Sequence, residues 1–368
     1  MTIEENPLLS KPRELVEAFF ASAEGDAIKI VNLLEKDLEI IKLASKVISP
    51  ISFESKKDNF RIAAVDGSST PFPAQHIGVS LAVISAGYMV MESGKIIASK
   101  YRAKSITSRD TTEKFSFTVK INRTLLEREM AIEALSLKPD ILIIDGSLTF
   151  PIPKWTRQYA QLQKELIFTA RELAEKTTTI GIIKRGVSSA IVATLFIQGK
   201  LDWDSISLLR DKFIMECLLR EGQLWAYSSL SELHPRILSM TLKKLRSKQK
   251  KPTREEFLGE YQRLANKEKL FLSLNLQRAF VKMFSAPPPF EVEYFPTVNL
   301  EKIMGRLRPW CNPATGLPFV LDLLDHDIMI EQALMRAYSE EVYARALNKT
   351  LEAEKLTALF KPLNPEKE

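Results

Sequence analysis

The sequence predicts an α/β protein in which helices flank a mixed β-sheet, and three observations support this fold class. Two apolar runs of strand length, residues 60–65 and 140–144, each lead into the tripeptide Asp-Gly-Ser. Between and after them, strand-like segments alternate with segments of helical period. With 368 residues, 45% of them hydrophobic, the chain can bury a large core.

The N-terminal part, residues 1–55, is predicted to be a helical segment that precedes the sheet. Apolar residues recur at helical spacing through residues 13–47. Gly25 predicts a break there, so we expect two helices that cover the sheet or a partner subunit.

Three strands are predicted between residues 60 and 101. The first ends at Asp66, the second covers 76–91, and the third covers 96–101 after the hairpin turn signal at 92–95. Residues 102–120 are basic and polar, which predicts a loop that either is solvated or follows phosphate groups.

A helix is predicted from about residue 122 to 137, and its period distinguishes two of its acids. Leu126 and Met130 belong to its apolar stripe. Glu127 falls at the edge of that stripe, whereas Glu129 lies on the polar side. Because a carboxylate that faces the core is costly unless it is paired or ligated, Glu127 is the better candidate for a metal-facing acid.

The segment that follows continues the alternation of strands and helices. We predict a strand ending at Asp145, a helix over 156–176, a strand over 179–183, a helix over 205–220 and a strand over 223–227. Three strands followed by helix, strand, helix, strand and helix is the ribonuclease H-like order. In that fold four acids meet at one sheet edge, and Asp66, Glu127, Asp145 and Asp211 occupy their places.

The C-terminal third is predicted to extend this core. Residues 234–258 form a basic insertion, which is either a solvated linker or a contact with nucleic acid. Two strands near 279–285 and 291–295 and a long helix over 321–348 make up a strand-helix extension at 270–348. A tail at 349–368 follows, so we expect one domain over 56–348 with its core at about 60–230.

The two aspartates at strand ends predict a divalent-metal site. Asp66 and Asp145 at one sheet edge repel each other unless a cation lies between them. The alternative is that each merely opens a turn. Oxygen ligands suit Mn²⁺ or Mg²⁺, and no Cys/His cluster indicates zinc. Lys184, at the end of another strand, either neutralises phosphate charge or is an ordinary exposed lysine.

The composition of the chain indicates which partners and which cellular compartment to expect. The net charge of +6 permits nucleic-acid binding. Two cysteines are too few for a disulfide framework, and no signal peptide or membrane span is evident. We therefore expect a cytoplasmic protein without a membrane partner.

Taken together, these motifs resemble the NurA nuclease family. The matching elements are Val65-Asp66-Gly67-Ser68, Glu127, Ile144-Asp145-Gly146-Ser147-Leu148, Gly181–Lys184, the segment Asp211…Glu221-Gly222, and Pro318-Phe319. The resemblance implies a metal-dependent DNA nuclease with 5′→3′ exonuclease and single-strand endonuclease activity in DNA end processing and repair. It also implies Mn²⁺ (or Mg²⁺), a homodimer, and a HerA-like hexameric ATPase as partner.

The resemblance further implies a set of site residues. Asp66, Glu127, Asp145 and Asp211 would bind the metal, with Lys184 and a late residue completing the catalytic set. That late residue is His326 or its neighbour Asp325.

Two other classes of protein remain open. One is a non-catalytic DNA-binding or scaffold subunit with the same fold. The other is an actin- or sugar-kinase-type ATPase, but its phosphate loop needs a residue between Asp and Gly, and Asp66 and Gly67 are adjacent. The P-loop pattern is also absent from the sequence.

Overall fold

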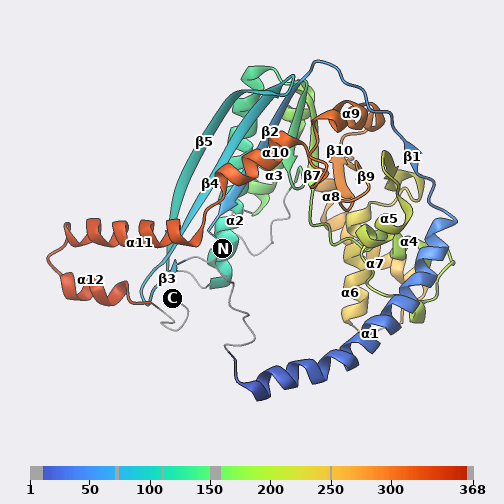
Figure 1. Ribbon diagram of the computed structural model, residues 1–368, viewed down its shortest axis with the longest axis horizontal. Helices are drawn as coiled ribbons and strands as arrows, with labels where there is room; N and C mark the ends of the chain where they lie inside the picture. The colour runs from blue at the N-terminus through green and yellow to red at the C-terminus, as the bar shows by residue number, and fades with distance from the viewer. Residues whose placement is uncertain (1–10, 71–73, 110–111, 150–158, 249–250, 363–368) are drawn as a thin grey trace. The chain divides into compact units, whose positions relative to one another are not determined.

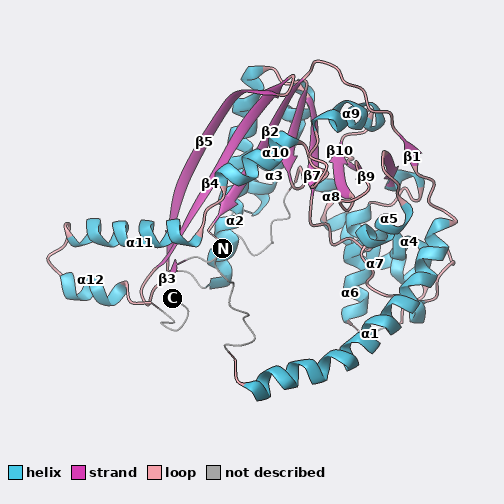
Figure 2. Ribbon diagram, viewed as in Figure 1, coloured by secondary structure: helices cyan, strands magenta, loops and turns pink. Residues whose placement is uncertain are grey.

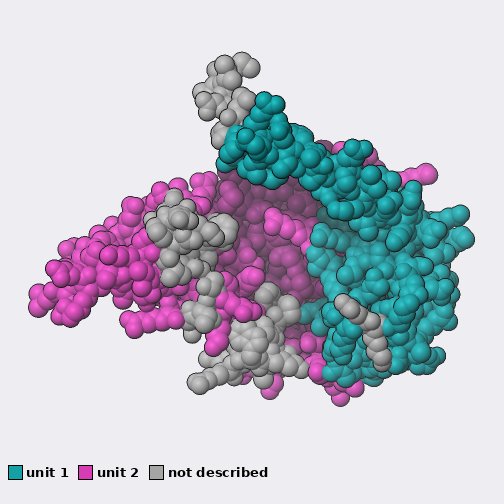
Figure 3. Space-filling model, turned by 90° about the horizontal axis from the view of Figure 1, so that it is seen from below, with its two compact units in different colours: residues 1–49, 187–218, 235–264 teal, residues 50–186, 219–234, 265–368 magenta. Residues whose placement is uncertain are grey.

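The computed structural model describes residues 11–70, 74–109, 112–149, 159–248 and 251–362. The chain divides into two compact units, drawn in teal and magenta in Figure 3. The helical unit comprises Met1–Ser49, Val187–Leu218 and Pro235–Leu264. The sheet unit comprises Pro50–Gly186, Leu219–His234 and Ala265–Glu368.

A ten-stranded mixed sheet forms the centre of the sheet unit in its described residues (Figures 1 and 2). The strands are β1 (Ile51–Ser52), β2 (Arg61–Ser69), β3 (Ala74–Gln75), β4 (Ser80–Glu92), β5 (Lys95–Ser108), β6 (Ile141–Asp145), β7 (Thr178–Ile183), β8 (Gln223–Ala226), β9 (Gln277–Lys282) and β10 (Phe290–Tyr294). Their order is β1-β8-β9-β10-β7-β6-β2-β4-β3, and β5 also pairs with β4. β2, β6 and β7 are parallel to one another, whereas β4 and β10 run antiparallel to their neighbours. The predicted mixed sheet flanked by helices is confirmed.

The hairpin between β4 and β5 forms where the turn signal predicts it. Ser93 and Gly94 both have positive φ, as a tight two-residue hairpin turn requires. The third strand, however, is longer than predicted: β5 pairs with β4 as far as Ser108, so the expected loop at 102–120 is wrong. The long basic side chains of this segment favour a loop, but Arg102 and Lys104 pair with acids on helix α2 (Thr112–Ala134).

Helices cover both faces of this sheet. Successive side chains of each strand point to opposite faces, and both sets are apolar. Ile62 and Ala64 of β2 face a core shared with α9 (Leu300–Leu307) and α10 (Phe319–Ile328). Ala63 and Val65 face a second core, shared with α2 (Thr112–Ala134) and α3 (Tyr159–Lys176). Figure 1 shows α10 crossing one face of β2 and β4 with α2 on the other. The period of two places Asp66 and Asp145 on the α10 face.

The predicted C-terminal helix over 321–348 is in fact two helices. α10 ends at Ile328, and α11 covers Gln332–Leu347. The Ile328 carbonyl accepts a hydrogen bond from Ser85 Oγ, and the Ile330 N–H donates one to Ser68 Oγ. Because these backbone groups are bonded to the sheet, the helix cannot continue through 329–331. A short helix, α12 (Ala353–Leu359), follows within the predicted tail.

The helical unit is built from five helices in its described residues. These are α1 (Arg13–Ser45), α4 (Ala190–Ile197), α5 (Asp211–Leu218), α6 (Pro235–Ser247) and the greater part of α7 (Arg254–Lys267). In the sheet unit, α8 (Lys269–Leu272) follows. None of the helices described in either unit is long and apolar enough to cross a membrane.

Two predictions for the helical unit are wrong. α1 continues through Gly25, where a Cβ would meet no described atom within 4 Å. The helix propensity of one glycine costs only about 1 kcal/mol, which does not end a helix. α4 was not predicted, because its residues 190–196 are buried on every side and so show no helical period. The predicted helix over 205–220 is correspondingly shorter and begins at Asp211.

Candidate metal site

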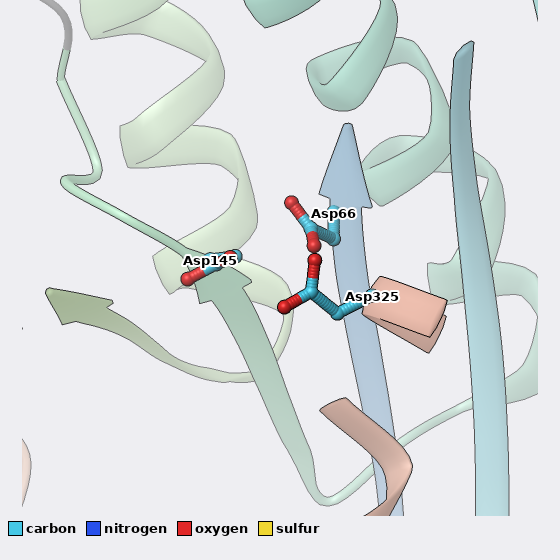
Figure 4. A group of neighbouring side chains, drawn as sticks. All are labelled: Asp66, Asp145 and Asp325. Carbon is cyan, nitrogen blue, oxygen red and sulfur yellow. The ribbon is translucent and has the colours of Figure 1, made fainter. Parts of the chain in front are cut away.

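Three aspartates from three elements meet at the carboxyl end of the parallel strands (Figure 4). Asp66 lies near the end of β2, Asp145 is the last residue of β6, and Asp325 lies on α10. One carboxylate oxygen of each lies within 4.8 Å of the other two. Among the described residues, this is the group of acids, thiols and imidazoles close enough together to hold a metal ion.

The environment of Asp66 and Asp145 disfavours the charged form of their carboxylates. Asp66 is only 5% exposed, and burial, followed by the charges of Asp145 and Glu127, raises its pKa to about 8. Burial also raises the pKa of Asp145, although Lys184 opposes this. Acids whose ionised form is destabilised in this way gain most when a cation binds between them.

Lys184 provides one positive charge within this group. It follows β7, and its Nζ lies 3.0 Å from Asp145 Oδ2 and 2.9 Å from Asp325 Oδ2. Burial alone would lower the pKa of this lysine, but the two carboxylates raise it above its usual value. Its side chain is 22% exposed, so Lys184 belongs to the acidic group and is not an ordinary exposed lysine.

Glu127 approaches the end of β2 from the opposite face. It is buried on α2, and Arg123 Nε lies 3.1 Å from its Oε1. Its carboxylate packs on Gly67, where a Cβ would lie 2.5 Å from Oε1. Burial raises the pKa of Glu127 to about 7, although Arg123 and Arg128 oppose this. Glu129, by contrast, is exposed and pairs with Lys104. The predicted phase of this helix is confirmed.

Serines in the two Asp-Gly-Ser motifs hold neighbouring segments. Ser68 and Ser85 are paired across β2 and β4, and both bond to the backbone at the end of α10. This fixes the helix one turn beyond Asp325. In the second motif, Ser147 donates a hydrogen bond to Glu293 on β10 at 2.7 Å.

Asp211, which the sequence predicts to be a metal ligand, has contacts typical of a helix cap. It lies in the helical unit, fully buried, and its two oxygens accept hydrogen bonds from the N–H groups of Ala190 and Ile191 at 2.8 and 3.0 Å. These are donors in the first turn of α4, which need a partner. Both carboxylate oxygens are occupied by these bonds, and we propose a helix-capping role in place of the predicted metal binding. That role could not be recognised because α4 itself was not predicted.

Of the two candidates for the late residue, Asp325 lies in the group of three acids, whereas His326 is exposed on α10 and lies outside that group. The period of the helix separates the two neighbours. Asp325 follows the buried Leu321 by four residues and adjoins the buried Leu324 and Ile328 face. His326 falls on the other side of α10. The helical phase alone would have favoured Asp325.

This arrangement defines a class of site. The candidate ligand atoms are carboxylate oxygens, two from the ends of parallel strands and one from α10, accompanied by a lysine and a further buried glutamate. Hard oxygen donors of this kind suit Mg²⁺ or Mn²⁺. The class is a carboxylate-rich centre for a divalent cation.

The family model of the NurA domain matches residues 60–330, so the chain belongs to the NurA family. The structure is similar to that of the NurA nuclease from Sulfolobus solfataricus, with 13% identity over 93% of this chain and 99% of that chain and a TM-score of 0.58. A NurA structure with manganese has 11% identity over 90% of this chain and 99% of that chain, with a TM-score of 0.54. A further NurA structure has 12% identity over 91% of this chain and 99% of that chain, with a TM-score of 0.52. A search of curated proteins by sequence finds no match.

Proposed function

We propose that this protein is a metal-dependent deoxyribonuclease that hydrolyses phosphodiester bonds. The observation that carries the proposal is the convergence of Asp66, Asp145 and Asp325 within 4.8 Å beside Lys184. Membership of the NurA family supports the same reaction. The family resemblance supports 5′→3′ exonuclease and single-strand endonuclease activity in DNA end processing and repair.

The donor set fits Mn²⁺ or Mg²⁺. Asp66, Asp145 and Asp325 would hold the ion, with Glu127 beside Asp66. A related NurA structure contains manganese. When bound, such an ion lowers the pKa of the attacking water and stabilises the leaving 3′ oxygen. Lys184, which is charged and only partly exposed, is placed to neutralise a phosphate oxygen once the strand binds.

A ribonuclease H-like core is the fold that best accounts for this site. Within the ten-stranded sheet, the neighbours β5, β4, β2, β6 and β7 are the third, second, first, fourth and fifth strands of such a core when the short β1 and β3 are set aside. The acids lie at the ends of the first and fourth of these strands.

The basic segment at 243–254 supports a structural role more than a DNA contact. Lys243 donates to the Val187 carbonyl at 2.7 Å, and Lys244 pairs with Glu260 at 2.9 Å. Lys251 pairs with Asp204 at 2.7 Å. Part of the charge of this segment is therefore neutralised inside the helical unit, and the proposed binding of DNA rests on the acidic site.

A homodimer, receiving DNA from a HerA-like hexameric ATPase, is the assembly that we propose. Support comes from α1, whose buried residues are Ile40 and Ala44 alone. Its large apolar side chains include Phe19 and Phe20, which are 59% and 61% exposed. An apolar face of this extent is typical of an interface. Light scattering at micromolar concentration measures the assembly directly. Both cysteines are thiols, which supports a reducing, cytoplasmic compartment.

Nuclease assays on end-labelled DNA test the proposed reaction. Asp66→Asn and Asp145→Asn should each abolish Mn²⁺-dependent cleavage while circular dichroism shows a folded protein, because losing a metal ligand removes several kcal/mol of transition-state stabilisation. Asp327→Asn, on the exposed side of α10, is the control and should stay active. Activity of the two site variants within about tenfold of wild type would contradict the proposal.

The same preparations separate the alternatives. ATP hydrolysis that is lost with Asp66 would favour the kinase-type ATPase. DNA binding without metal-dependent cleavage in the wild type would favour the scaffold subunit.

A further inference from the structure

A buried ion pair lies beside the second Asp-Gly-Ser motif and takes no part in the chemistry proposed above. Glu293 on β10 and Arg278 on β9 are paired across the two strands. Arg278 Nε and Nη2 lie 3.0 and 2.9 Å from Glu293 Oε1, and both residues are buried. Burial of two charges is costly unless the pair has good geometry and further hydrogen bonds satisfy its remaining polar atoms.

The second oxygen of Glu293 holds the residues that follow Asp145. Glu293 Oε2 accepts hydrogen bonds from Ser147 Oγ at 2.7 Å and from the Leu148 N–H at 2.8 Å. Arg128 Nη2, from α2, donates to the carbonyls of Ser147 and Leu148 at 2.9 and 3.1 Å. The backbone two and three residues after Asp145 is therefore held by both its N–H and its C=O groups.

The path of this segment depends on a glycine that faces Glu293. Gly181 on β7 is the register partner of Glu293. A Cβ on Gly181 would lie 2.5 Å from the Gly146 carbonyl oxygen, so the chain after Asp145 lies directly on β7. The absence of a side chain at residue 181 leaves room for Gly146 and Leu148.

The Glu293 carboxylate is ionised in this setting. Burial alone would raise the pKa of Glu293, but Arg278 and the hydrogen bonds from Ser147 and Leu148 lower it below its usual value. Hydrogen bonds to an ionised acceptor are about twice as strong as neutral ones. They are suited to holding a turn in one conformation.

We propose that Glu293 is a positioning residue, which fixes Ser147 and Leu148 and thereby the direction in which Asp145 presents its carboxylate to the metal. This role rests on the proposed metal-dependent function, because it acts through Asp145. Groups that orient a metal ligand without touching the metal typically change metal affinity by about 10- to 100-fold when they are removed. A role in stability alone would leave metal affinity unchanged.

Glu293→Gln, with Glu291→Gln as matched control, separates these two roles. Glu291 Oε1 lies 3.1 Å from Arg278 Nη1, so each variant removes one carboxylate partner of the same arginine. Of the two glutamates, only Glu293 accepts hydrogen bonds from Ser147 and Leu148. Glutamine has the size of glutamate, but its NH₂ group cannot accept the bonds that Oε2 accepts.

Two measurements test the role of Glu293: hydrogen exchange at the Leu148 amide and the affinity for Mn²⁺. Hydrogen exchange of the Leu148 amide, measured without metal, should be faster in Glu293→Gln and unchanged in Glu291→Gln. Mn²⁺ binding, measured by electron paramagnetic resonance, should weaken about tenfold or more in Glu293→Gln only. Both variants should lose thermal stability. Ser147→Ala, which removes the hydrogen bond to Glu293 and the longer one from the Thr149 N–H, should weaken Mn²⁺ binding by about 2- to 10-fold.

The outcomes distinguish this role from the function on which it rests. Wild-type protein that binds no Mn²⁺ would overturn the proposed function and this role together. Wild-type protein that binds Mn²⁺, with Glu293→Gln binding it equally well, would overturn the positioning role alone. If Glu293→Gln does not fold, unchanged Mn²⁺ affinity in Ser147→Ala overturns the role.

Discussion

The two strand ends that carry Asp66 and Asp145 have the same tripeptide, but they need its glycine for different reasons. A Cβ on Gly67 would lie 2.5 Å from Glu127 Oε1, so this position requires space. A Cβ on Gly146 would meet no described atom within 4 Å, but φ is +96° there, so this position requires backbone freedom. The same residue thus serves packing at one end and conformation at the other.

The two serines differ in the same way. Ser68 Oγ accepts a hydrogen bond from the Ile330 N–H beyond α10, the helix that carries Asp325. Ser147 Oγ donates to Glu293 and holds the turn after Asp145. The first motif therefore fixes another element of the site, whereas the second fixes its own chain. A repeated motif can place equivalent acids through unrelated contacts.

We expect the largest loss of nuclease activity at Glu127, which contacts Gly67. Glu127→Gln should reduce nuclease activity about as much as the changes at Asp66 and Asp145, because the buried carboxylate faces the end of β2. Glu129→Gln is the matched control on the solvated side of α2 and should be mild. Initial rates of DNA cleavage measure both. The reverse order of effects would mean that the wrong acid has been assigned to the site.

The glycines provide a direct test of the difference between the two ends. Gly67→Ala should displace the Glu127 side chain, whose Oε1 and Cγ would lie 2.5 and 2.6 Å from the new Cβ, and lower activity by about tenfold or more. Gly146→Ala should lower stability by about 1–3 kcal/mol, because alanine is strained at positive φ. Denaturant unfolding and cleavage rates measure the two effects.

A second change shows whether Gly67 acts through Glu127. In a Glu127→Ala background, Gly67→Ala should cost little further activity, because the two residues are in contact. Additive losses would contradict the proposed contact.

A smaller effect is expected in the pH dependence of stability without metal. Because the pKa of Asp66 is raised from 3.8 to about 8, its contribution to stability is fully present below about pH 4 and is lost as the pH rises through 8. With a chelator present, Asp66→Asn should therefore become more stable relative to wild type as the pH rises from 5 to 9. Thermal melts across this range measure the difference. A difference that stays constant with pH would contradict the raised pKa.

Part of the site could be predicted from the sequence, because the spacing of apolar residues within single strands and helices determines where its acids lie. The runs that lead into Asp66 on β2 and Asp145 on β6 are apolar, and the helical period of α2 separates Glu127 from Glu129. Asp66 and Asp145 come together because neighbouring parallel strands carry them to one edge of the sheet.

Other parts depend on contacts that no local pattern contains. α4 is buried on all sides and shows no helical period, so the sequence does not indicate that Asp211 caps it. The break between α10 and α11 depends on Ser68 and Ser85, which lie far away in the sequence. Glu293 and Arg278 lie on strands whose pairing brings them to Ser147. Long-range pairing is the information that the sequence pattern lacks.

Mn²⁺ binding by wild-type protein, Asp325→Asn and His326→Asn, followed by electron paramagnetic resonance, tests the central claim most directly. The account predicts that wild type binds Mn²⁺, that Asp325→Asn weakens binding by about tenfold or more, and that His326→Asn leaves it unchanged. Mn²⁺ binding that depends on His326 and not on Asp325 would contradict the site described here.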